Sequence, residues 1–273
     1  MLVLEKRAGK MIWLSILTWC IGVWMVGDLS AGELTGKTVN GCGGAAEWPP
    51  YLYFTRRDGK KSGDVDGFSS TVVNEILTIE GAVGVIELAP WRRCMREVER
   101  GVHYQILLDA STNEEREAVY HVSRPYYTMT PSYFYSKRHH PDGLPINEAG
   151  DLKSYRINGI HGYNYSDYGL RADDLEGSVD DHETLIRKLH RNRIDLFIEW
   201  VEVFGGFREI GKPFIDDPDL GHALVPNLSK TTMHLMFPRT EAGLALKLVF
   251  DKQLDALEAS GRLAEILGEY VKQ

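Results

Sequence analysis

The stretch Ile106-Leu107-Leu108-Asp109-Ala110-Ser111-Thr112-Asn113-Glu114-Glu115-Arg116 is the most informative part of the chain. Its apolar first half predicts a buried strand, and its polar second half predicts a turn that opens a helix. Such a turn offers an anion three kinds of partner: the free backbone N–H groups of the helix start, the hydroxyls of Ser111 and Thr112, and the guanidinium of Arg116. The sequence therefore predicts an anion-binding turn at the end of a strand.

The composition is that of a globular protein with a full core. The chain has 273 residues, of which 43% are apolar, so it is long enough for two domains of ordinary size. Its 39 acidic and 31 basic residues give a net charge of −8, and the basic residues form no stripe. We therefore expect no nucleic-acid partner.

The first 31 residues are typical of a secretory signal peptide. Lys6, Arg7 and Lys10 precede the uncharged apolar run 11–26, and Ala31 supplies a small residue at a cleavage position. The run is shorter than the roughly 20 residues that span a membrane. We expect cleavage after Ala31 and a periplasmic mature protein.

Two cysteines, Cys42 and Cys94, remain after that cleavage. One stands at the end of the first expected strand and the other in the helix that follows the second. Exported proteins meet an oxidising compartment, where paired thiols form disulfides. The sequence therefore predicts a disulfide between Cys42 and Cys94.

Strand and helix patterns alternate along the chain, which favours an α/β fold with crossover connections. The first strand is expected to end in a glycine-rich turn at 41–44, and an extended loop should follow at 48–51. The expected strands are 37–41, 83–88, 104–108, 156–161 and 194–199, with an extended crossover at 126–136 and a return crossing at 224–228 and 233–238. The expected helices are 68–81, 91–101, 114–122, 181–192, and a long tail from 240 to 271 that Gly261 interrupts.

Together with Ser123-Arg124-Pro125-Tyr126-Tyr127, the opening stretch resembles a signature of periplasmic solute-binding proteins. The resemblance is to the amino-acid-binding class of ABC transporters (type 2, bacterial family 3), and it extends to the order of elements over nearly the whole mature chain. It implies a two-lobed α/β fold with the ligand cleft between the lobes. Lobe 1 would comprise 32–129 and 231–273, and lobe 2 would comprise 130–230.

The same resemblance implies a function. It describes a monomeric, non-enzymatic protein that captures a small carboxylate-bearing solute, an amino acid or derivative, for a membrane permease. No Walker A, G-x-S-x-G or H-E-x-x-H motif is present, so we expect no cofactor and no metal. Two alternatives stay open: a periplasmic dehydratase-like enzyme acting on a cyclic carboxylate, with Glu199, Glu202 or Asp109 as general acid, and a ligand sensor that docks on a membrane receptor.

In the resembled family, the arginine that matches Arg116 holds the ligand's α-carboxylate with help from the residue that matches Ser111. Asp109 stands where many relatives carry a hydroxyl residue that holds the α-amino group. A carboxylate there can bind an ammonium directly, begin the helix or pair with Arg116. The glycine turn from Gly162 to Tyr165 would meet the ligand from lobe 2, through Tyr163 and Asn164.

Trp200 occupies the position where the family often places an aspartate for the ammonium. This departure makes a standard α-amino acid ligand doubtful. Tyr51 and Trp91 follow prolines at strand ends, and we expect them to supply ring or apolar contacts; Trp48 also lies near the cleft. The candidate ligand-binding set is Arg116, Ser111, Asp109, Thr112, Tyr51, Trp91, Tyr163, Asn164, Glu199 and Trp200.

Overall fold

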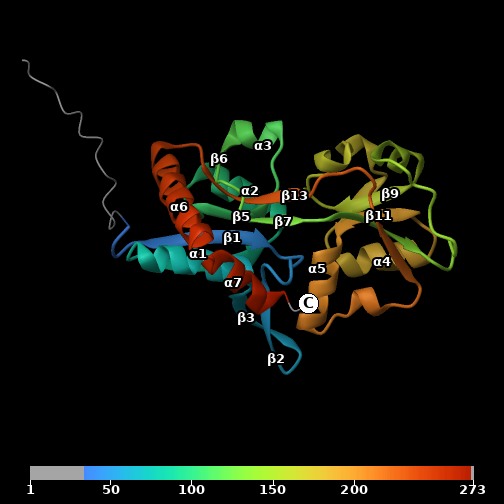
Figure 1. Cartoon of the computed structure of the whole chain (residues 1–273), viewed down its shortest axis with the longest axis horizontal. Helices are drawn as coiled ribbons and strands as arrows, with labels where there is room; N and C mark the ends of the chain where they lie inside the picture. Colours follow the sequence, from blue (N-terminus) through green and yellow to red (C-terminus); the bar gives the residue numbers. More distant parts are fainter. Residues whose placement is uncertain (1–33, 272–273) are drawn as a thin grey trace, which may run out of the picture. The chain divides into compact units, whose positions relative to one another are not determined.

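The computed structural model describes residues 34–271. The expected signal peptide at 1–31 lies outside this range. Among the described residues, no helix combines the length and the apolar character needed to cross a membrane. The described chain forms two main β-sheets and one separate hairpin, with helices packed on the sheets (Figure 1).

The first sheet has the strand order β4-β1-β5-β13-β6, with β7 also paired to β13. Strand β1 runs parallel to β4 and β5, whereas β13 runs antiparallel to β5, β6 and β7. Its strands are β1 (Thr38–Gly44), β4 (Val83–Ala89), β5 (Ile106–Ala110), β6 (Tyr120–Val122), β7 (Tyr127–Met129) and β13 (Thr231–Pro238). The associated helices are α1 (Phe68–Ile79), α2 (Trp91–Arg100), α3 (Glu114–Val119), α6 (Glu241–Ala259) and α7 (Arg262–Tyr270).

The second sheet has the order β10-β9-β11-β8-β12, and its elements are drawn in light green to orange in Figure 1. Its strands are β8 (Pro131–Ser136), β9 (Ile157–Ile160), β10 (Gly177–Val179), β11 (Leu196–Trp200) and β12 (Leu220–Leu224). The helices here are α4 (His182–His190) and α5 (Val201–Gly206), with short 3-10 helices at Ala149–Ser154, Ser166–Tyr168, Ala172–Asp174, Phe207–Ile210 and Phe214–Asp216.

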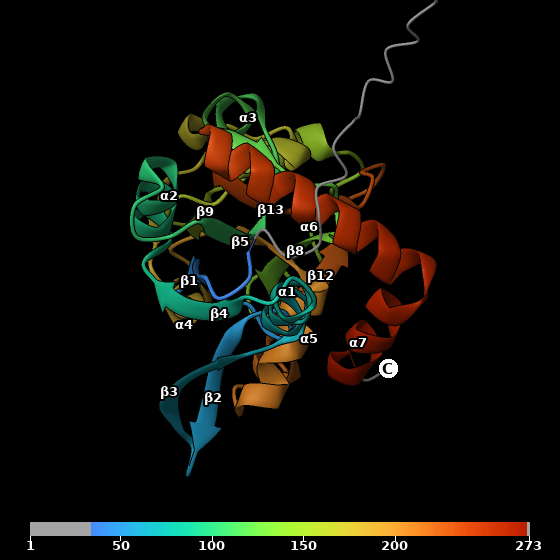
Figure 2. The ribbon, with the colours of Figure 1, turned by 90° about the vertical axis from the view of Figure 1, so that its left-hand side faces the viewer.

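A β-hairpin of β2 (Tyr53–Arg57) and β3 (Lys60–Asp66) extends away from the helices, as Figure 2 shows. None of the strands expected from the sequence includes these residues. Its turn is Asp58-Gly59, and both residues have positive φ, at 51° and 72°. That conformation suits tight hairpin turns, and an Asp-Gly pair is the residue choice that favours them.

Two expected boundaries were wrong. Residues 41–44 are the last part of β1 and not a turn, because the sheet needs small residues there: a Cβ on Gly43 would lie 2.1 Å from Leu52 Cδ2. The helix expected over 114–122 ends at Val119, and Tyr120–Val122 pairs with β13 instead. The other expected strands and helices are present, with ends shifted by a few residues.

The predicted disulfide is present. Cys42 in β1 and Cys94 in α2 are bonded, with their Cα atoms 5.5 Å apart. Both residues are completely buried, together with Val98 and Leu107. The bridge therefore fastens α2 to the first sheet directly beneath the end of β1.

Candidate ligand-binding site

A cavity of about 30 Å³ lies where residues of the two sheets meet. A single water needs at least about 10–15 Å³ of such space, so the cavity holds about two. Its lining residues come from the ends of β1, β5 and β11, from the first turns of α2 and α3, from β13 and from the loops that follow β1, β5 and β9. They are Gly44, Trp48, Trp91, Asp109, Ser111, Arg116, Tyr163, Asn164, Trp200 and Met233.

Arg116 is held by main-chain carbonyls from both sheets. Asn113 caps α3 by accepting a hydrogen bond from the Arg116 backbone N–H at 2.8 Å, which fixes the start of the helix. The guanidinium donates from Nη1 to Ser111 O at 2.7 Å and from Nη2 to Gly162 O at 3.1 Å, and it lies 5.7 Å from the centre of the Trp91 ring. Burial lowers the pKa of Arg116 to about 10. Within residues 34–271 no carboxylate forms an ion pair with it.

The turn after β9 closes against the turn after β5. Gly162 O accepts a second hydrogen bond, from Trp91 Nε1 at 3.0 Å, and Asn164 Nδ2 donates to Thr112 O at 2.8 Å. Position 162 requires glycine, because its φ is +79° and a Cβ there would lie 2.8 Å from Arg92 Cγ. Each bond joins a side-chain donor beside one sheet to a backbone carbonyl beside the other.

Asp109 is the penultimate residue of β5 and has a positive φ of 58°, which is uncommon for a residue other than glycine. Its Oδ1 accepts hydrogen bonds from the hydroxyls of Tyr126 at 2.7 Å, Tyr127 at 2.8 Å and Ser69. Its Oδ2 is enclosed, although the residue as a whole is only half-buried, and it has no hydrogen-bond partner in the described chain. Burial raises the pKa of this carboxyl, and the three hydroxyl donors offset only part of that effect.

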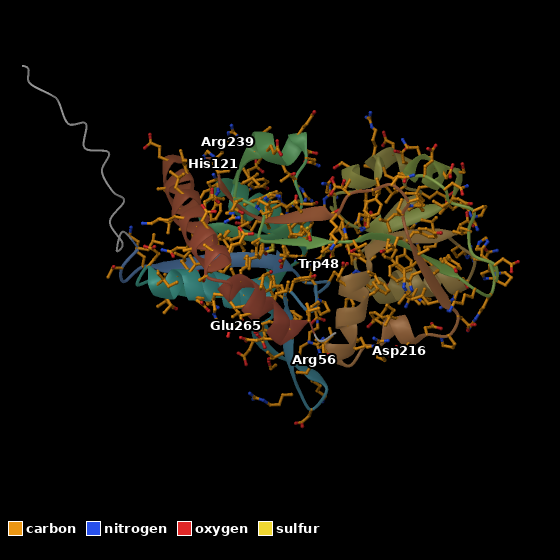
Figure 3. All side chains as sticks on the ribbon, viewed as in Figure 1. Trp48, Arg56, His121, Asp216, Arg239 and Glu265 are labelled. Atoms are coloured by element: carbon orange, nitrogen blue, oxygen red, sulfur yellow. A yellow bond between two sulfur atoms is a disulfide. The ribbon has the colours of Figure 1, made fainter. Side chains whose placement is uncertain are left out.

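Three aromatic rings form a wall of the cavity, which we call the aromatic wall: Trp48, Tyr163 and Trp200. The Trp48 ring centre lies 5.3 Å from that of Tyr163 and 5.3 Å from that of Trp200, both in edge-to-face contact. Figure 3 labels Trp48 where the first-sheet elements approach those of the second sheet. Trp200 Nε1 is buried and, among residues 34–271, has no acceptor.

Seven of the ten predicted ligand-binding residues line this cavity: Arg116, Ser111, Asp109, Trp91, Tyr163, Asn164 and Trp200. Thr112 contributes only its main-chain carbonyl, to Asn164. Tyr51 lies behind the cavity, where its ring stacks on Tyr127 at 4.1 Å. Gly44 and Met233 were not anticipated, because nothing in their local sequence distinguishes them from strand residues.

Glu199 does not reach the cavity. Its Oε2 lies 2.7 Å from His182 Nε2, and both side chains are almost completely buried. Its Oε1 accepts from the backbone N–H of Trp200. Neighbouring strand residues point to opposite faces, so a strand that turns Trp200 toward the cavity turns Glu199 away from it. Across residues 34–271, no cluster of three or more His, Cys, Asp or Glu side chains could hold a metal ion.

A family model described as bacterial extracellular solute-binding proteins, family 3, matches residues 42–273. The chain belongs to this family. The match covers both sheets apart from the first four residues of β1, and it includes every residue of the cavity lining. Among curated protein sequences, none matches the chain.

Three solved structures share the fold. The substrate-binding protein of an amino-acid ABC transporter matches with a TM-score of 0.69 at 15% identity, over 86% of this chain and 100% of its own. AbpA from Streptococcus pneumoniae, bound to L-arginine, matches with a TM-score of 0.69 at 20% identity, over 85% and 94%. EhuB in complex with hydroxyectoine has a TM-score of 0.69 at 19% identity, over 86% and 89%. The fold is therefore the two-lobed α/β fold of type 2 solute-binding proteins.

Proposed function

We propose that this family 3 solute-binding protein captures a small zwitterion, a carboxylate-bearing amino acid or derivative, and delivers it to the permease of an ABC transporter. One observation carries the proposal. Arg116 and Asp109 are two opposite charges that line the same cavity, and within the described chain neither has an ion-pair partner. A zwitterion supplies the missing partner of each.

The energetic argument rests on the cost of burying unpaired charge. An enclosed ion without a counter-ion is strongly destabilising, and a charge-assisted hydrogen bond from a ligand removes that cost. The Arg116 guanidinium would receive the carboxylate of the solute beside Ser111. The enclosed Asp109 Oδ2 would receive its cation.

The lobe boundaries expected from the sequence support a closing motion. The chain passes between the sheets after β7, which ends at Met129, and again before β13, which begins at Thr231. We propose that lobe 1 (32–129 and 231–273) and lobe 2 (130–230) open at these crossings to admit a solute larger than the present cavity. The bonds of Arg116 to Gly162 and of Asn164 to Thr112 would then re-form as the lobes close.

Binding without catalysis is favoured by where the acidic residues lie. Glu199 is paired with His182, and Glu202 accepts hydrogen bonds from the Thr130 backbone N–H at 3.0 and 3.1 Å. Of the three acids that a dehydratase-like mechanism would use, only Asp109 lines the cavity. The proposed role is therefore capture and release of an unchanged solute.

Two solved structures of the same fold hold L-arginine and hydroxyectoine, and both compounds carry a carboxylate together with a cationic nitrogen group. Export to the periplasm through the signal peptide at 1–31 fits the extracellular description of the family and the disulfide between Cys42 and Cys94.

A thermal-shift panel tests the proposal. Amino acids, N-alkylated amino acids, hydroxyectoine, polyamines and keto acids are added to the purified protein. A ligand present at 100 times its Kd adds about 2.7 kcal/mol of stability. We expect saturable stabilisation by at least one zwitterion, with the ligand recovered unchanged. Stabilisation by polyamines or keto acids alone would contradict the proposal, as would turnover of the ligand.

A further inference from the structure

The proposed function gives the cavity two subsites: a cation subsite at Asp109 and an anion subsite at Arg116. Their surroundings differ. The Arg116 guanidinium lies against Trp91, whereas Asp109 is linked to the aromatic wall through a shared partner. Trp48 Nε1 donates to the Tyr127 hydroxyl at 3.2 Å, and that hydroxyl donates to Asp109 Oδ1 at 2.8 Å. The three rings of Trp48, Tyr163 and Trp200 line the same cavity of about 30 Å³ as Asp109, so a cation bound at Asp109 also meets them.

Few acceptors are available for the N–H groups of that cation. Asn164 Oδ1 already accepts from Asn113 Nδ2 and from the Ser166 backbone, each at 3.1 Å. Ser111 Oγ accepts from both Asn164 and Arg116. Asp109 Oδ2 is the one enclosed side-chain oxygen of the lining without a partner, within residues 34–271.

The small number of free acceptors favours ammonium groups that have few N–H donors. A primary ammonium has three N–H donors and loses water from all of them on burial. One would bond to Asp109 Oδ2, and no second enclosed side-chain oxygen of the lining is free, within residues 34–271, to accept the other two. An ammonium whose hydrogens are replaced by carbon has fewer donors to satisfy, and its carbon substituents make favourable contacts with aromatic faces.

We infer that the solute's cation is a carbon-substituted ammonium with one or two N–H groups, bonded to Asp109 Oδ2 and packed on Trp48, Tyr163 and Trp200. The inference rests on the proposed function and narrows its ligand class. Cyclic imino acids and their N-methyl derivatives have this chemistry, whereas ordinary α-amino acids do not.

Calorimetric titration with three probes tests the inference. L-Valine, L-proline and N-methyl-L-proline have carbon skeletons of similar size and the same carboxylate, and their ammonium groups carry three, two and one N–H. Arg116 therefore contributes equally to all three. We expect N-methyl-L-proline to bind at least about tenfold more tightly than L-valine, with L-proline between them.

Equal or tighter binding of L-valine would overturn the inference while leaving the proposed function intact. Failure of all three probes would also overturn it. The proposed function would fail as well only if the wider thermal-shift panel contained no stabilising zwitterion. The two failures are therefore distinguishable.

Variants of the aromatic wall provide a second readout. The ratio of the L-valine Kd to the N-methyl-L-proline Kd should fall at least about threefold in Trp48→Leu and in Tyr163→Leu. Because it is a ratio, a general loss of affinity cancels. Tyr163 is half-buried, so its variant carries the test if Trp48→Leu does not fold. Tyr155→Leu, at a half-buried tyrosine outside the cavity, should keep the wild-type ratio. An unchanged ratio in the wall variants would overturn the inference.

Discussion

Replacing Asp109 with asparagine should stabilise the ligand-free protein and abolish its binding. Asparagine fits the backbone, since it tolerates positive φ, and its Oδ1 can still accept from Tyr126, Tyr127 and Ser69. The substitution removes a buried charge that has no ion-pair partner among residues 34–271. We estimate a gain of about 1–2 kcal/mol, since the new amide N–H groups offset part of the relief. For a domain of this size, that corresponds to about 2–8 °C in Tm.

The gain should depend on pH in a defined direction. Burial raises the pKa of Asp109 in the folded state, so protonation favours folding of the wild type at low pH, and that contribution is lost as pH rises through the raised pKa. The difference in Tm between Asp109→Asn and wild type should therefore be largest at neutral pH. It should vanish below the ordinary carboxyl pKa, where both side chains are neutral.

Melting curves over a pH series, paired with calorimetric titration, provide the assay. The matched control is Asp66→Asn, because Asp66 also accepts a tyrosine hydroxyl, from Tyr270 at 2.8 Å, but lies outside the cavity. It should show neither the gain in Tm nor a loss of affinity. An Asp109→Asn variant that melts below wild type at neutral pH, or that binds zwitterions normally, would refute the reasoning.

Three other perturbations probe Arg116, the disulfide and Glu199. Arg116→Ala should weaken zwitterion binding by about 30-fold to several thousand-fold in calorimetric titration, and Arg116→Lys should recover only part of it, because a point charge lacks the guanidinium fork. Wild-type affinity in Arg116→Ala would show that Arg116 does not bind the carboxylate of the solute. Reducing the bond between Cys42 and Cys94, whose positions are 52 apart, should cost about 4 kcal/mol in the chain-entropy model and lower Tm; two alkyl groups added to unreduced protein would show that the bridge is absent. Glu199→Gln should lower Tm by disturbing the bond to His182 yet change affinity less than about threefold, and a large affinity loss without a Tm change would place Glu199 in the site.

Local chemistry made much of the site predictable. The strand–turn–helix pattern around Arg116 located the guanidinium, and Gly162 marked the opposing turn. Both signals lie within a few residues of the group that they position. The same holds for the helices, where apolar spacing predicted α1 and where Thr240 and Gly261 mark the starts of α6 and α7.

Long-range partners could not be predicted. The three hydroxyls on Asp109 Oδ1 come from Ser69, Tyr126 and Tyr127, so the unpaired state of Oδ2 emerges only when α1 and the start of β7 pack beside β5. Two other features could have been predicted from the sequence. Strand alternation already places Glu199 and Trp200 on opposite faces of the sheet. The Asp58-Gly59 turn indicates the β2–β3 hairpin.

The most direct test of the zwitterion site compares one molecule with its two charged halves. L-Proline, pyrrolidine and cyclopentanecarboxylate share a five-membered ring. L-Proline carries both charges, pyrrolidine carries only the cation, and cyclopentanecarboxylate carries only the anion. Titrated into the wild-type protein, L-proline is expected to bind at least about 30-fold more tightly than either half, because Arg116 and Asp109 are each left unpaired by one of them. Binding of pyrrolidine or cyclopentanecarboxylate as tight as that of L-proline would contradict the proposal of a zwitterion site formed by Arg116 and Asp109.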